Sequence, residues 1–136
     1  MCWPEDYLDA HNRHWEDAEL LFQNGRLANA DHLYGLSAEC GLKALWLGIT
    51  RRATLPSQQH IHIDRFWDQF VRLSRNTRRS RMLLRRLPPR NPFSDWNVNQ
   101  RYASHQHFSH NFVEPHRQGA EMVHTLVQNA RQIGWI

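Results

Sequence analysis

A run of small residues within an apolar helical segment constrains this chain more than any other feature. Residues 35–46 read GLSAECGLKALW, in which glycine, serine, alanine and cysteine are interspersed with leucine and tryptophan. A glycine in a helix interior costs roughly 1 kcal/mol relative to alanine, so Gly41 requires a compensating contact. We expect Gly41 to lie where a second helix approaches closely.

The hydrophobic periodicity predicts a single all-α domain over residues 1–136, with four to five helices and no strand. The second helix is apolar on two sides, with one stripe of small residues and one of larger residues. Such a helix is central and contacts neighbours or a partner chain on both sides. The predicted helices are residues 4–24, 27–49, 63–73 and 76–87, and a last one that begins between Asn99 and Glu114.

The composition excludes several classes of protein. No segment approaches the roughly 18 apolar residues of a membrane span, and the acidic N-terminal residues do not match a signal peptide. Cys2 and Cys40 alone do not make a disulfide framework. We therefore expect a cytoplasmic protein with no membrane partner. Neither a glycine-rich phosphate loop nor a Ser/His/Asp arrangement is present, so we expect no ATPase, no acyltransferase and no cofactor.

The positive charge is concentrated in one segment and consists almost entirely of arginine. Sixteen of the seventeen basic residues are arginines, and eight of these fall between Arg72 and Arg90. A planar guanidinium suits bidentate contact with phosphate and stacking on bases. Two interpretations stand: a solvated basic face, or an RNA-binding surface whose contacts would be Arg78, Arg79, Arg85 and Arg86.

Two segments of the chain resemble the HEPN-domain family. Residues 14–34 (HWEDAELLFQNGRLANADHLY), followed by residues 35–46, resemble its opening helical hairpin. Residues 93–103 (FSDWNVNQRYA) are similar to the segment that leads into its last long helix. The family consists of small all-α proteins of prokaryotic toxin–antitoxin and phage-defence systems, many of them ribonucleases. The resemblance implies a HEPN-like antiparallel bundle, a homodimer whose protomers share one cleft, and RNA as the substrate.

The ribonuclease members carry an Arg that is followed after four to six residues by a His. Here Arg101 is followed by YASHQ and then His107, an interval of five residues, although Tyr102 occupies a position that is usually polar. In a regular helix His105 would share a face with Arg101 and His107 would not, so His105 remains an alternative. The resemblance implies metal-independent endoribonuclease chemistry. A His near neutral pKa exchanges the proton, and the Arg stabilises charge on the phosphoryl oxygens.

Several other polar residues have structural interpretations. Glu39 lies in a mostly apolar helix and needs a cation, for which Arg101 is the predicted partner and Lys43 a local alternative. His11 and His116 lie on apolar faces and are expected to be satisfied core or interface residues. Trp96 and Tyr102 are expected to hold the loop that carries them on the core.

Two further expectations complete the functional prediction. His105, His107 and His110 do not complete a structural zinc site, which usually takes four ligands, so no metal is expected. The alternative to a nuclease is a catalytically silent HEPN module that binds a nucleotide or a partner such as a nucleotidyltransferase.

Overall fold

The computed structural model describes residues 3–136, and every element of regular secondary structure within them is helical. The predicted all-α class and the number of helices are therefore confirmed. None of these helices is both long enough and apolar enough to cross a membrane. The α-helices are α1 (Tyr7–Gln23), α2 (Leu27–Thr50), α3 (Ile63–Leu73), α4 (Arg78–Leu84) and α5 (His110–Gln132). Four 3₁₀ turns complete the set: η1 (Ser57–Gln59), η2 (Ser74–Asn76), η3 (Val98–Tyr102) and η4 (His105–His107).

Local capping accounts for the ends of the first helix. Helix α1 begins at Tyr7 rather than at the predicted Pro4, because the side chain of Asp6 accepts a hydrogen bond from the backbone N–H of Asp9 at 3.0 Å. The predicted end of this helix at residues 24–25 is confirmed, because α1 ends at Gln23 and Asn24 is its C-cap. Gly25 has a φ of 72°, a left-handed conformation that glycine adopts without strain.

The basic helix α4 is shorter than the predicted residues 76–87. Thr77 is extended, with a φ of −128°, and its side chain accepts a hydrogen bond from the backbone N–H of Ser80 at 3.1 Å. Thr77 is therefore the N-cap, and the helix can begin only after it.

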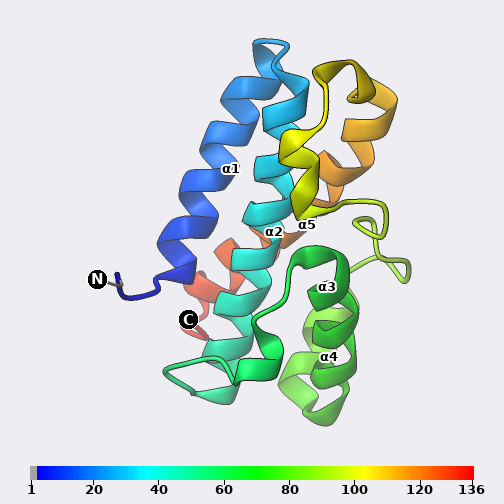
Figure 1. Ribbon diagram of the computed structural model, residues 1–136. Helices are drawn as coiled ribbons and strands as arrows, with labels where there is room; N and C mark the ends of the chain where they lie inside the picture. Colours follow the sequence, from blue (N-terminus) through cyan, green and yellow to red (C-terminus); the bar gives the residue numbers. More distant parts are fainter. Residues whose placement is uncertain (1–2) are drawn as a thin grey trace.

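Helix α2 is the central element of the bundle. In Figure 1 it runs between α1 and α5, with α3 packed against its lower half. Fourteen of its 24 residues are buried, which confirms the prediction of a central helix with two buried sides. Both sides are covered by α1, α3 and α5 of the same chain.

The small residues of α2 lie at close contacts, as predicted for Gly41. A Cβ at Gly41 would lie 2.6 Å from Val123 Cγ1 of α5 and 2.7 Å from His11 Nδ1 of α1. A Cβ at Gly35 would overlap the indole ring of Trp96. Because Gly35 and Gly41 have no side chains, residues of α1, α5 and the long loop before α5 can pack directly against the backbone of α2.

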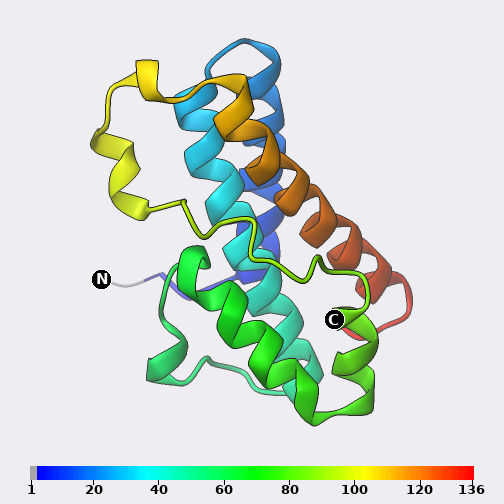
Figure 2. The ribbon, with the colours of Figure 1, turned by 90° about the vertical axis from the view of Figure 1, so that its right-hand side faces the viewer.

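The segment between α4 and α5 runs back along the bundle to the end where α5 begins (Figure 2). It contains little regular structure and is held by aromatic side chains. Phe93 and Trp96 are fully buried or nearly so, and Phe108 is 6% exposed. The prediction that Trp96 holds this loop on the core is confirmed. The loop places η3 and η4 beside α2, where the candidate site lies.

Candidate functional site

Arg101 and His105 line one cavity of about 540 Å³ at the start of α2. They do not lie on a common α-helix. Arg101 belongs to η3 and His105 to η4, and the extended residue Ala103 separates the two turns. Both residues therefore reach the cavity through the path of the loop, and helical spacing does not describe their relation. The other lining residues are Gly25, Arg26, Leu27, Ala28, Asn29, Gln100, Ala103 and Phe108.

The cavity is suited to an anion. The first turn of α2 contributes to its wall, and no side chain within residues 3–136 caps that turn. The leading N–H groups of a helix lack partners within the helix, and the helix dipole places partial positive charge there. The side chains of Arg26 and Arg101 add two full positive charges. A phosphate group would find hydrogen-bond donors and positive charge on several sides.

His107, the partner that the family spacing favours, is exposed and lies outside the lining of this cavity. Tyr102 is 77% exposed, so the prediction that it packs on the core is wrong. Its ring lies 4.9 Å from Arg101 Cζ, at a distance typical of a cation–π contact. Tyr102 therefore contacts the Arg101 side chain and does not pack on the core.

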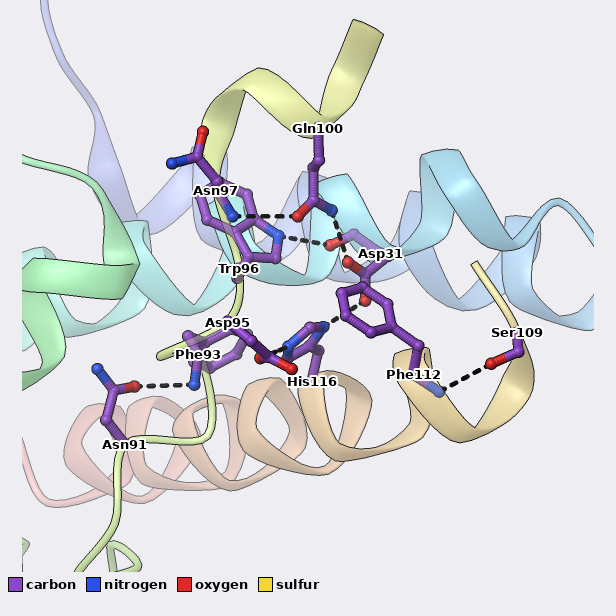
Figure 3. A network of polar contacts seen from close by, with 10 residues as sticks. All are labelled: Asp31, Asn91, Phe93, Asp95, Trp96, Asn97, Gln100, Ser109, Phe112 and His116. Carbon is purple, nitrogen blue, oxygen red and sulfur yellow. Dashed lines mark hydrogen bonds and ion pairs between the residues drawn. The ribbon is translucent and has the colours of Figure 1, made fainter. Parts of the chain in front are cut away.

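Asp31 of α2 holds η3 in place (Figure 3). Gln100 Nε2 donates to Asp31 Oδ2 at 2.6 Å, and Trp96 Nε1 donates to the Asp31 carbonyl oxygen at 3.0 Å. Asn97 and Gln100 also form a capping box that closes the first turn of η3. The residue preceding Arg101 is thus attached directly to the central helix.

His116 of α5 lies between two carboxylates, as Figure 3 shows. Its Nδ1 is 2.6 Å from Asp31 Oδ1, and its Nε2 is 2.7 Å from Asp95 Oδ1. Ionised carboxylates only accept hydrogen bonds, so an imidazole that satisfies both must carry protons on both nitrogens. Burial lowers the pKa of His116, but hydrogen bonds and negative charge from Asp31 and Asp95 outweigh it, and the pKa is raised. We therefore describe His116 as a buried imidazolium.

The prediction that His11 and His116 are satisfied within the core is confirmed. His11 is fully buried, and its Nδ1 lies 2.7 Å from the Ser37 carbonyl oxygen while its Nε2 lies 3.0 Å from His124 Nδ1. Burial lowers the pKa of His11 to about 4, so it is neutral where His116 is charged. The sequence did not identify Asp31 and Asp95. A histidine on an apolar face implies polar partners. No local pattern identifies them here, because Asp31 and Asp95 are separated from His116 by 85 and 21 positions in the sequence.

Glu39 is paired, but not with the predicted Arg101. Lys43 Nζ donates to Glu39 Oε2 at 2.9 Å, and His62 Nδ1 lies 3.0 Å from Glu39 Oε1. Lys43, the local alternative, lies one turn along the same helix and is itself buried. The prediction that Arg101 neutralises Glu39 is therefore wrong. Arg101 instead lines the cavity.

The arginines of the basic segment face different surroundings. Arg78 and Arg85 line a hollow of about 320 Å³ on α4, together with Arg81 and the half-exposed Met82. Arg79 instead lies over the Trp135 ring, with 4.9 Å from Cζ to the ring centroid. The fourth predicted RNA contact, Arg86, borders a separate hollow that contains Glu121. The structure thus brings Arg78 and Arg85 together, and places Arg79 and Arg86 elsewhere.

Within residues 3–136, no three His, Cys, Asp or Glu side chains are grouped as metal ligands. Comparison of the chain with protein-family models, with curated proteins and with solved structures finds no match. The HEPN resemblance consequently depends on the two sequence segments that carry it.

Proposed function

We propose that this protein is an RNA-directed, HEPN-like component of a prokaryotic toxin–antitoxin or phage-defence system that cleaves RNA without a metal ion. The observation that supports this function is the cavity at the start of α2, which Arg101 and His105 line together. His105 replaces His107 as the favoured catalytic partner of Arg101, because His107 does not line the cavity.

The chemistry follows from the residues present. The guanidinium of Arg101 would neutralise charge that builds on the phosphoryl oxygens during attack of the RNA 2′-hydroxyl. His105 would exchange a proton with a reacting oxygen, since an imidazole can act as either a general acid or a general base. Arg26 and the first turn of α2 would hold the phosphate. The products would be a 2′,3′-cyclic phosphate and a 5′-hydroxyl.

The homodimer in this proposal derives from the family resemblance. Helix α2 has two apolar sides, but both are covered within one chain, so they no longer require a partner. A composite cleft would bring two Arg101–His105 pairs together. The expected mass in solution is then about twice the 16.3 kDa of one chain.

A binding module is the second candidate, and the same cavity favours it. Two arginines and a helix N-terminus suffice to hold a phosphate without any proton transfer. Such a module would bind a nucleotide or a partner such as a nucleotidyltransferase.

The test is cleavage of end-labelled RNAs of mixed sequence by the purified protein in EDTA. We expect cleavage by the wild-type protein, loss of cleavage in Arg101→Ala and His105→Gln, and retention in His107→Gln. A wild-type protein that leaves every RNA intact, yet binds a labelled nucleotide through Arg101, would establish the binding module instead.

A further inference from the structure

The cavity at the start of α2 has more in its lining than the cationic residues that the proposed function uses. Four apolar residues also contribute to it: Leu27, Ala28, Ala103 and Phe108. Its volume of about 540 Å³ lies within the range of about 300–1,000 Å³ that is typical of small-molecule sites. The cavity therefore has room for a nucleobase as well as for a phosphate group, and apolar surface on which a base can pack.

Two carboxamide side chains, those of Asn29 and Gln100, also line the cavity. Gln100 is engaged at both ends, because its Nε2 donates to Asp31 Oδ2 at 2.6 Å and its Oε1 accepts from the backbone N–H of Asn97 at 3.1 Å (Figure 3). The Asn29 side chain makes no hydrogen bond to any other of residues 3–136, and the residue is exposed. Asn29 thus offers a ligand in the cavity both an N–H donor and a carbonyl acceptor.

The position of Asn29 in its helix directs this amide toward the cavity. Asn29 is the third residue of α2, which begins at Leu27. Side chains on an α-helix lean toward its N-terminus. The amide is therefore directed back over the first turn, whose unpaired N–H groups and Arg26 border the same cavity. A base held at Asn29 would belong to a nucleotide whose phosphate lies at that turn.

We propose that this cavity holds an adenine nucleotide of the RNA and that Asn29 is the residue that selects the base. The inference rests on the proposed function, since it names the base beside the cleaved phosphate. An asparagine amide pairs with adenine through two hydrogen bonds, in which Oδ1 accepts from the N6 amino group and Nδ2 donates to N7. Packing on apolar or aromatic side chains favours every base to a similar degree, so the discrimination falls to Asn29.

The other three bases do not offer the same pair of groups to this amide. On its Hoogsteen edge adenine presents the acceptor N7 beside the N6 donor. Guanine presents two acceptors on that edge, while cytosine and uracil each present one polar group. A bidentate contact of this kind discriminates against the wrong base by at least about 5-fold.

The experiment measures base preference in two ways. Sequencing of the products maps where a mixed-sequence RNA is cleaved in EDTA, and calorimetry gives the affinities of AMP, GMP, CMP and UMP. The variants are Asn29→Leu, which keeps the size of the side chain without its polar atoms, and Asn29→Ala. The matched control is Asn99→Ala, because Asn99 is an exposed asparagine of η3 that does not line the cavity.

We expect the wild-type protein to cleave beside adenine and to bind AMP at least about 5-fold more tightly than the other three nucleotides. Both Asn29 variants should cleave without this preference and bind the four nucleotides about equally. Asn99→Ala should keep the wild-type preference. Circular dichroism checks that each variant is folded, and an exposed position such as Asn29 tolerates both substitutions.

The outcomes separate this inference from the proposed function. Wild-type cleavage without base preference, or a preference that survives in both Asn29 variants, would overturn the role of Asn29 and leave the Arg101–His105 function standing. A protein that cleaves no RNA but binds AMP preferentially through Asn29 would overturn the nuclease and support the role of Asn29 in a binding module. Equal affinity for the four nucleotides without any cleavage would overturn both.

Discussion

The buried pair of Asp31 and His116 gives the most discriminating test of the structure. Asp31→Asn keeps the shape of the side chain but removes the charge that compensates the fully buried His116 imidazolium. It also places an N–H group where both neighbours, His116 Nδ1 and Gln100 Nε2, are donors. Breaking a buried ion pair by removing one partner costs about 3–5 kcal/mol.

This cost translates into a large shift in the melting temperature. One kcal/mol corresponds to about 4–8 °C in domains of 60–100 residues and about 2–4 °C in domains of 150–250 residues, so a chain of this length falls between. We therefore expect Asp31→Asn to melt roughly 10–20 °C below the wild-type protein. Thermal unfolding followed by circular dichroism at pH 7 measures it.

The matched control is Asp95→Asn. Asp95 contacts the other nitrogen of the same histidine, but its side chain is 62% exposed. Solvent screens its charge, so its loss should cost about 1 kcal/mol or less. Equal melting temperatures for the two variants would refute the assignment of a buried imidazolium whose essential counterion is Asp31.

Three further predictions test other parts of the molecule. Gly41→Leu should cost at least about 1–3 kcal/mol in urea unfolding, since even a Cβ would lie 2.6 Å from Val123 Cγ1; unchanged stability would refute the close contact. Because His11 has a pKa of about 4 in the folded protein against an ordinary value of 6.5, the unfolded chain binds a proton that the buried ring does not, and the free energy of unfolding should fall by about 2 kcal/mol between pH 7.5 and pH 5. The difference in stability between the wild-type protein and His11→Gln should therefore shrink or reverse at pH 5. Charge reversal at Arg78 and Arg85 should weaken RNA binding and flatten its salt dependence, whereas an unchanged salt slope would make the basic segment a solvated face.

The sequence predicts those parts of the fold that depend on local pattern. Gly41 is identifiable because glycine is unfavourable within a helix unless a contact needs the space, and the structure supplies that contact. The buried state of His116 is likewise predictable from the apolar face on which it lies. Its partners are not, because Asp31 and Asp95 approach it only after the loop before α5 has folded back along the bundle.

The candidate site illustrates the same limit. Helical geometry would place Arg101 and His105 on one face, but the segment forms two 3₁₀ turns, and the loop path brings both residues to the cavity. The sequence predicts the wrong cation for Glu39, because Lys43, one turn away on the same helix, donates a hydrogen bond to its carboxylate.

The position of Asp31 also determines the order in which the site can form. Its contacts reach residues 65, 69 and 85 positions later in the chain. Closing such long loops is slow compared with forming a local helix hairpin. While the chain is being synthesised, α1 and α2 can pair early, but Asp31 lacks its counterion until His116 has left the ribosome. An RNA-cleaving protein built in this way would remain inactive as a nascent chain, and would acquire its Arg101 site only when α5 has docked.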